Sequence, residues 1–240
     1  MSQSSDPLWR DPLWRDLCDL RGELDRIDNA LHDLLMARAD VVRQVAGLRA
    51  HGKVALRPGR EAQIIARLLA RNHGALPAAS VSRVWREILA SSLSMQTDFA
   101  IVVTGEALAA VAREQFGALT PVRLVADMVA ALDLLRARAV TAVLLPVEAA
   151  LDGVLLKDLY VVARLPFWAA RPDHTPTAQA WVIANTPPDP SDNDVSLVAC
   201  GGQVFEIEGF LSPDDPRVAG CGDDAVLLGA YAVPISGEAI

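Results

Sequence analysis

Three arginines on one long helical pattern have the spacing to bind a small anion. Arg38 falls on a stripe of aliphatic residues, where a guanidinium group is costly unless an anion pairs with it. Arg49 lies eleven residues further on, about 20° around a helix and about 16 Å along its axis. These two side chains therefore face the same way and can span a small dianion. Arg21 lies about 100° from that stripe, so in an antiparallel pair of chains it can approach the partner's site.

Polar residues also stand at the ends of two shorter helical patterns. Arg60 and Glu61 fall in the first turn of one pattern, which opens RPGRE. On the other, an i, i+4 stripe that begins at Val84 ends in two hydrogen-bonding side chains, Ser92 and Gln96. Each feature alone is typical of a surface charge or a polar helix end. Together with the arginine on the aliphatic stripe, they predict one internal, cationic cavity with hydrogen-bonding groups.

The sequence pairs none of these residues with a nucleophile and its base. His32, His51 and His73 fall on helix surfaces or helix ends, with no Cys or Ser placed beside them. No glycine-rich phosphate loop precedes a helix, and the three cysteines lack metal-ligand spacing. We therefore expect no cofactor and no metal. Several arginines with a glutamine and a glutamate suit a reaction that needs only positioning and electrostatic stabilisation of a small dicarboxylate.

A sustained heptad pattern predicts the long helix that carries the three arginines. Aliphatic residues recur four and three positions apart from Leu13 to Leu48, and Gly52 would end the helix. A helix of roughly 38 residues is about 57 Å long, more than a compact domain of this size accommodates internally. Two shorter helices are predicted at 58–71 and 78–96. The apolar stripe of the long helix is longer than these two helices can bury, which predicts an intertwined homodimer.

After Asp98 the pattern changes to short apolar runs, which first alternate with helical segments. Strands are predicted at 100–103, 122–125, 142–146, 159–165, 180–184, 194–199, 203–211 and 226–235, and helices at 105–116 and 127–138. The segment TPPDPSDND (186–194) is rich in Pro and Asp, which is typical of a linker. The predicted fold class is therefore α + α/β, with an N-terminal three-helix domain and a C-terminal α/β domain.

The charge of the 240-residue chain is unevenly divided. Residues 1–98 hold 14 basic and 12 acidic side chains, whereas residues 99–240 hold 8 and 18, and the net charge is −8. This balance argues against nucleic acid or an anionic membrane as the partner. The N-terminus lacks an apolar signal core, and no apolar run reaches the roughly 18 residues of a membrane span. We therefore expect a cytoplasmic protein.

Three stretches in this order resemble the all-helical class of chorismate mutases. They are LRGELDRIDNALHDLLMARADVVRQVAGLR, RPGREAQIIARLL and VWREILASSLSMQ. The resemblance covers about 80 residues and places a mutase domain at 13–98, after a leader at 1–12. It implies an isomerase that converts the dianion chorismate to prephenate in phenylalanine and tyrosine biosynthesis, by an intramolecular [3,3] rearrangement in an intertwined homodimer.

The resemblance also implies roles for the arginines of the long helix. Arg38 would bind a substrate carboxylate in its own subunit, and Arg21 would contact the second carboxylate from the partner subunit. Arg49 falls where the family usually has a lysine that touches the ether oxygen and a carboxylate. An arginine there is longer than lysine but still able to donate hydrogen bonds.

The two shorter helices supply the remaining implied contacts. Arg60 and Glu61 match an Arg-Glu pair whose glutamate holds the substrate hydroxyl. Ser92 and Gln96 match a carboxylate-binding serine and a glutamine that donates to the ether oxygen. The family often has an acid three residues before the Arg-Glu pair, where this chain has Arg57. We therefore expect a hydroxyl contact to be missing or replaced.

The second half more faintly resembles the prephenate dehydratase and ACT regulatory regions of bifunctional P-proteins. In LLPVEAALDG, Ala149 and Ala150 replace Asn and Ser of the dehydratase pattern, and the tripeptide at 179–181 reads Gln-Ala-Trp in place of Thr-Arg-Phe. We therefore expect a degenerate dehydratase-like region at 99–185, without dehydratase activity. The truncated ACT-like region at 186–240 lacks the phenylalanine-binding motifs of the family.

Two other functions remain compatible with the sequence. An isochorismate pyruvate lyase resembles the same three-helix fold, although the pair Arg60-Glu61 and the appended second half favour the mutase. The other function is that of an interaction module, formed by a catalytically inactive helical dimer. Arg49 and Arg57 would then be signs that the catalytic site has been lost.

Overall fold

The computed structural model of the chain describes residues 12–48, 56–153, 155–169 and 178–236. The chain divides into two units, Met1–His51 and Gly52–Ile240. In the first, the described residues form one helix, α1 (Pro12–Leu48), as the heptad pattern predicted. Its 37 residues make it about 55 Å long. Among the described residues, no helix combines the length and the apolar character needed to cross a membrane.

The aliphatic stripe of α1 is exposed along its length. The exposed fraction is 58% at Leu24, 54% at Leu31 and 67% at Leu34. The other exposed members of the stripe are Leu13, Leu17, Leu20, Ile27, Val41 and Leu48. A water-exposed apolar stripe of this length is typical of a helix that packs against another chain or element.

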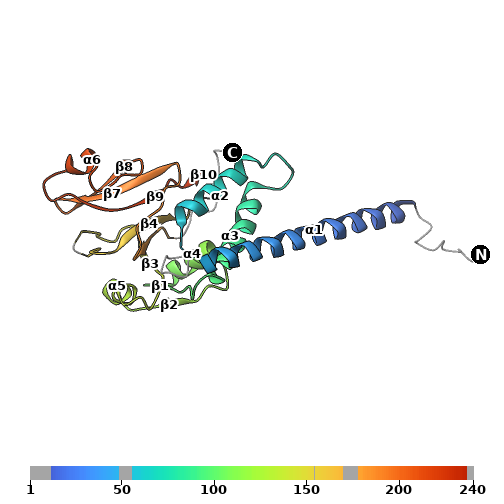
Figure 1. Ribbon diagram of the computed structural model, residues 1–240, viewed down its shortest axis with the longest axis horizontal. Coiled ribbons are helices and arrows are strands. Elements are labelled where there is room, and N and C mark those ends of the chain that lie inside the picture. The colour runs from blue at the N-terminus through green and yellow to red at the C-terminus, as the bar shows by residue number, and fades with distance from the viewer. Residues whose placement is uncertain (1–11, 49–55, 154, 170–177, 237–240) are drawn as a thin grey trace, which may run out of the picture. The chain divides into compact units, whose positions relative to one another are not determined.

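The second unit contains the two shorter helices and an α/β domain (Figure 1), which confirms the predicted fold class. The helices are α2 (Pro58–Ala70), α3 (Ala78–Ser94), α4 (Glu106–Phe116), α5 (Met128–Arg136) and α6 (Pro216–Ala219). The strands are β1 (Ile101–Val103), β2 (Val122–Leu124), β3 (Ala142–Pro146), β4 (Tyr160–Leu165), β5 (Trp168–Ala169), β6 (Ala180–Ala184), β7 (Asp194–Cys200), β8 (Gln203–Glu208), β9 (Val226–Ala232) and β10 (Ile235–Ser236). Only α6, β5 and β10 lack a counterpart in the sequence prediction.

One mixed sheet runs through both parts of the C-terminal half. Its strand order is β2-β1-β3-β6-β4-β9-β7-β8, and β5 pairs separately with β10. Strands β2, β1 and β3 are parallel, as the alternation of strands and helices predicted, whereas β6 runs antiparallel to both β3 and β4. Strand β9 pairs in parallel with β4. Strands from residues 99–185 and from residues 186–240 therefore share one hydrogen-bonded sheet.

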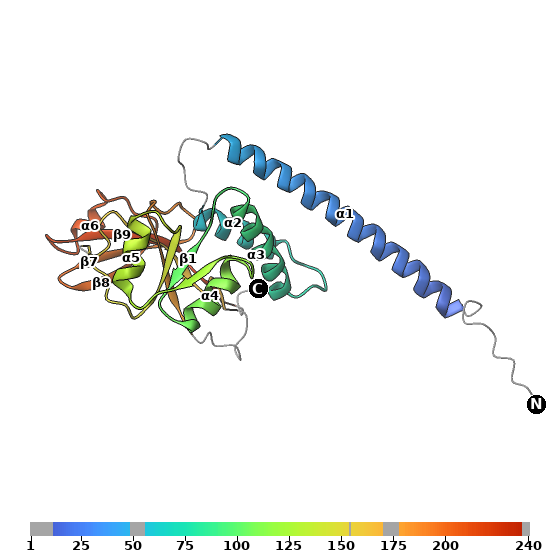
Figure 2. The same cartoon turned by 90° about the horizontal axis from the view of Figure 1, so that it is seen from below.

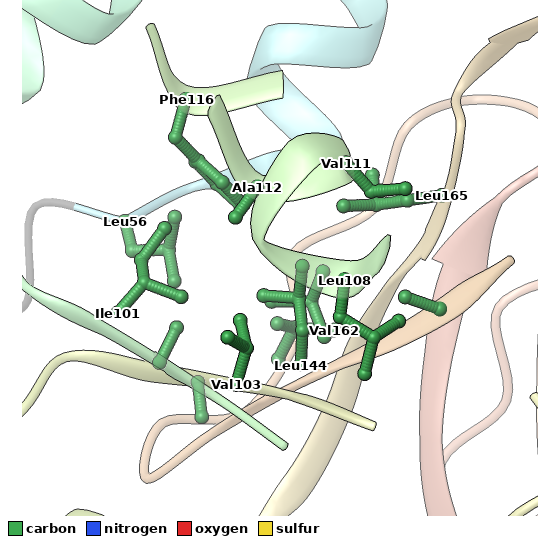
Figure 3. Packing of buried hydrophobic residues seen from close by; sticks show 14 of the residues in the cluster. Leu56, Ile101, Val103, Leu108, Val111, Ala112, Phe116, Leu144, Val162 and Leu165 are labelled. Atoms are coloured by element: carbon green, nitrogen blue, oxygen red, sulfur yellow. The ribbon is translucent and has the colours of Figure 1, made fainter. Parts of the chain in front are cut away.

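Helices cover both faces of this sheet. Successive side chains of a strand point to opposite faces. Ile101 and Val103 of β1 accordingly pack with α4 in one core (Figure 3), whereas Val102 packs with α5 in the other. Because their side chains are buried on both faces, β1, β3 and β6 read as continuous apolar runs.

A third core joins α2 and α3 to the sheet. These two helices lie side by side in both views (Figures 1 and 2). Ile65 and Leu69 of α2 and Leu89 of α3 are buried together with Phe167, which lies between β4 and β5. The C-terminal half therefore supplies part of the core that buries the apolar faces of α2 and α3.

We expect Gly229→Ala to destabilise the second unit. Gly229 has a φ of +142°, and an added Cβ would overlap the backbone oxygen of Val161 in β4. Strain from such a φ alone costs about 1–3 kcal/mol, so the free energy of unfolding in urea should fall by at least about 2 kcal/mol. The control is Gly74→Ala, whose added Cβ would have no atom within 4 Å. Equal stability of the two variants would contradict the close pairing of β4 with β9.

Candidate active site

The described arginines of α1 stand at different levels of the helix. Arg38 is half-buried, and burial lowers the pKa of its guanidinium. Arg21 is exposed, with its guanidinium carbon 5.8 Å from the centre of the Trp14 ring, a cation–π contact. Seventeen residues separate the two arginines, about 25 Å along the axis, so one helix cannot bring both to the same small ligand. Arg49 lies outside the described residues.

The start of α2 is capped by a residue from the far end of the chain. Arg57, which flanks the helix, makes no side-chain capping bond, and the backbone N–H groups of Gly59 and Arg60 donate to the carboxylate of Asp189 instead. The donor–acceptor distances are 3.2 and 3.1 Å. The Arg57 Nε atom donates to the same carboxylate at 3.2 Å. A carboxylate is favourable here because the N–H groups at a helix start carry partial positive charge.

The segment 186–194, predicted to be a linker, thus contacts α2 directly. Besides Asp189, it offers two acceptors to the Gln63 amide, the Asp192 carboxylate at 3.0 Å and the Pro190 carbonyl at 3.5 Å. Gln63 in turn accepts from the Arg60 guanidinium at 3.1 Å, and Arg60 is exposed. The first turn of α2 is therefore fixed through both its backbone and its side chains.

Glu61 and Arg86 line one small cavity on the inner side of α2 and α3. The cavity has room for about one water molecule, ~10 Å³, and the Arg164 and Phe167 side chains also line it. Arg86 is only 8% exposed, with its guanidinium carbon 5.3 Å from the centre of the Phe167 ring. Its Nη2 atom is buried and has no hydrogen-bond partner among the described residues. A buried polar atom of this kind is uncommon and marks a position where packing alone does not explain the residue.

Burial shifts the ionisation of both groups. It raises the pKa of Glu61 to about 7, an effect that the positive Arg86 opposes and the negative Asp189 reinforces. Burial lowers the pKa of Arg86 to about 10, opposed by the charges of Glu61 and Glu114. Near neutral pH the Glu61 carboxyl can therefore either donate a hydrogen bond to a hydroxyl group or accept one from it.

Ser92 and Gln96 lie on the C-terminal part of α3 and beyond its last turn. The Ser92 hydroxyl donates to the Ile88 carbonyl at 2.6 Å, and the Gln96 amide donates to the Ser92 carbonyl at 2.8 Å. Ser92 is buried and Gln96 half-buried. Val84, at the start of the stripe predicted for α3, is 55% exposed.

The structure thus brings Glu61 together with Arg86, a residue that the sequence reasoning did not select. Arg86 falls on the buried face of α3 with Ser82, Leu89 and Leu93. The available signal was a charged residue on the apolar face of a predicted helix. The same signal identified Arg38. The predicted residues Arg21 and Arg38 belong to the first unit, whereas Arg60, Glu61, Ser92 and Gln96 belong to the second.

Comparison with protein families identifies the helical part. Residues 20–97 match the family model of chorismate mutase type II. This match confirms the resemblance inferred from the three helical stretches, and the family consists of isomerases. The matched residues include most of α1, all of α2 and α3, and each of the seven predicted site residues.

Two known proteins are similar to parts of the chain. The bifunctional chorismate mutase/prephenate dehydratase of Neisseria gonorrhoeae is 33% identical over 85 residues, which are 35% of this chain and 23% of that protein. This chain therefore matches about a quarter of the length of that relative. A solved structure of prephenate dehydratase from Streptococcus mutans aligns with 57% of this chain and 100% of its own, at 14% identity and a TM-score of 0.35.

We expect Glu61 to make stability fall as pH rises from 4.5 to about 7. The folded chain holds the Glu61 proton up to about pH 7, whereas the unfolded chain releases it near the usual pKa of 4.5. The folded state thus binds more protons in this interval, and its stability decreases with pH by at most about 1.4 kcal/mol per unit. Urea unfolding across this range should show a weaker pH dependence for Glu61→Gln. The matched control is Glu106→Gln, in the exposed first turn of α4. If the free energy of unfolding had the same pH dependence in wild type and in Glu61→Gln, the raised pKa of Glu61 would be contradicted.

Proposed function

We propose that this protein is a chorismate mutase, which converts chorismate to prephenate in phenylalanine and tyrosine biosynthesis. The observation that carries the proposal is the family match over residues 20–97, because it includes each of the seven predicted site residues. The rearrangement is intramolecular, so the protein has to fold the dianion into its reactive conformer and stabilise the negative charge that develops on the ether oxygen. The reaction needs no cofactor.

In this proposal the arginines of the long helix bind the two carboxylates of chorismate. Arg38 holds one carboxylate within its own subunit, where its partial burial strengthens the ion pair by excluding water. Arg21 comes from the partner subunit, which agrees with the separation of about 25 Å between the two arginines on one helix. Arg49 donates to the ether oxygen in place of the usual lysine.

The shorter helices complete the proposed site. Arg60 and Glu61 lie in the turn of α2 that Asp189 caps, and Glu61 holds the substrate hydroxyl. Ser92 binds a carboxylate, and Gln96 donates to the ether oxygen. Each donor to an oxygen that gains charge in the transition state is typically worth about 3–4 kcal/mol.

We also propose that the working unit is a homodimer. The exposed leucines of α1 form an apolar stripe about 50 Å long, and a second copy of the helix has the matching heptad pattern. Covering that stripe removes apolar surface from water, which favours association by about 25 cal/mol per Å². The same pairing would bring the Arg21 of one chain to the site of the other.

For the C-terminal half we propose a dehydratase-like region at 99–185 without dehydratase activity and an ACT-like region at 186–240. At the position of the family's Thr-Arg-Phe motif, Trp181 is buried, donates to the Val147 carbonyl at 3.2 Å and packs 5.5 Å from the Tyr231 ring. These contacts are typical of core packing. The helical domain of the proposal comprises residues 13–98.

We expect the purified full-length chain to convert chorismate to prephenate, and Arg38→Ala to reduce kcat/KM by at least about a hundredfold. The loss corresponds to one charge-assisted contact in the transition state, about 3 kcal/mol. Arg26→Ala is the matched control, because Arg26 lies on the same helix but is exposed and pairs with Glu23 at 3.2 Å. Prephenate formation followed in a spectrophotometer measures both.

The same assay separates the two other functions. Salicylate and pyruvate formed from isochorismate, without turnover of chorismate, would identify a lyase. If neither chorismate nor isochorismate were converted, the helical interaction module would be the remaining function.

Mixing two inactive variants tests the contribution of Arg21 across subunits. In a heterodimer of Arg21→Ala and Arg38→Ala chains, one site has Arg38 from the first chain and Arg21 from the second, and the other site has neither. We expect each variant alone to be nearly inactive. Random exchange of subunits should then restore about a quarter of the wild-type activity, since half of the dimers are mixed and each has one intact site. No recovery after denaturation and joint refolding would show that both arginines act within one chain.

A further inference from the structure

We propose that Asp189, in the C-terminal half, is a positioning residue of the mutase site, because its carboxylate fixes the turn of α2 that carries Arg60 and Glu61. This inference rests on the proposed mutase function. It gives the C-terminal half a role in catalysis that does not depend on dehydratase chemistry.

One carboxylate at the start of α2 accepts hydrogen bonds from both backbone and side-chain donors. Asp189 accepts from the backbone N–H groups of Gly59 and Arg60 and from the Arg57 side chain. The Asp189 side chain is only 16% exposed, so water competes weakly for these bonds. Arg57 offers no acceptor where a helix usually has Ser, Thr, Asp or Asn at its start. The acceptor that this helix start needs comes from about 130 residues further along the chain.

The backbone at Gly59 packs closely against the backbone of Asp189 and Pro190. A Cβ at this position would overlap the backbone of Asp189 and Pro190. Only glycine allows the two backbones to approach this closely, so the RPGRE turn and the segment 189–190 fit each other directly. The contact is between backbones and leaves little freedom for the helix to shift.

The residues that follow Asp189 are held by hydrogen bonds at the start of β7. Two residues further on, the Ser191 backbone N–H and hydroxyl donate to the carboxylate of Asp194, the first residue of β7, at 2.9 and 2.6 Å. Asp194 is 6% exposed and lies opposite Ala232 of β9. The Asn193 carbonyl accepts from the Val233 N–H at 2.9 Å. Asp189, which binds the start of α2, is thus connected to the strands of the C-terminal half by a short, hydrogen-bonded segment.

Electrostatics make this role distinguishable from simple capping. The charged groups around Glu61 are Arg86 of α3, Arg164 of β4, the neighbouring Arg60 and the carboxylate of Asp189, which is paired with Arg57; Glu114 of α4 acts on Arg86. Removing the negative charge at position 189 lowers the pKa of Glu61, whereas removing the positive charge of Arg86 raises it. A residue that only stabilised the fold, with no charge acting on Glu61, would leave the pKa of Glu61 unchanged on substitution.

The test compares full-length wild type with Asp189→Asn and with Asp127→Asn. Asp127 is a matched control, because it caps α5 by accepting from the Ala130 N–H at 2.8 Å. We expect Asp189→Asn to lower kcat/KM for chorismate by about tenfold or more, since small displacements of positioned groups are costly, and Asp127→Asn to change it less than about twofold. In the pH–rate profile, the midpoint that disappears in Glu61→Gln should move to lower pH in Asp189→Asn and to higher pH in Arg86→Met.

The outcomes separate this inference from the proposed function. An active wild type with unchanged kcat/KM and pH midpoint in Asp189→Asn would overturn the role of Asp189 and leave the mutase proposal standing. An inactive wild type would overturn both. Equal losses in Asp189→Asn and Asp127→Asn would reduce Asp189 to a structural cap. If Asp189→Asn does not fold, Asp189→Glu decides: the proposal requires a wild-type pH midpoint with a lower kcat/KM, and wild-type kinetics would refute it.

Discussion

The carboxylate of Asp189 links the helical and the α/β parts of the second unit. The first four N–H groups of any helix lack partners within the helix, and Arg57 cannot supply an acceptor for those of α2. Asp189 provides it from the segment that leads into β7, at the price of tying the helix start to the sheet. The core around Phe167 acts in the same direction, because it buries the apolar faces of α2 and α3 against the end of the sheet. The position of Glu61 follows from these two constraints.

Glu61 and Arg86 are destabilising in isolation, and their surroundings offset this only in part. A buried carboxyl loses hydration, which is why its proton stays bound up to about pH 7. Arg86 opposes this loss, and the Phe167 ring partly replaces water around its guanidinium. Within the described part of the chain, the Nη2 atom of Arg86 still lacks a hydrogen-bond partner. Buried polar groups that are incompletely paired are uncommon in protein cores.

Arg164 joins several strands of the C-terminal half through its side chain. Arg164 of β4 donates to Glu206 of β8, to the Tyr231 hydroxyl of β9 and to Gln179 beside β6. Its guanidinium also stacks over the Trp181 and Tyr231 rings, at 5.4 and 5.9 Å. These bonds join strands from both parts of the α/β domain. A sheet joined in this way gives Asp189 a fixed support from which to hold the start of α2.

The sequence by itself determined the elements and the family of the helical part. Heptad spacing and strand-length apolar runs are local signals, so α1 and the strands lay where predicted, and Arg38 stood out as a charge on an apolar stripe. Only the tertiary structure decided which surfaces these elements share. Asp189 and Arg86 act through partners about 130 and 25 residues away, and the neighbours of α3 within the second unit determine which of its side chains are buried there. Periodicity defines a face, but long-range packing decides what covers it.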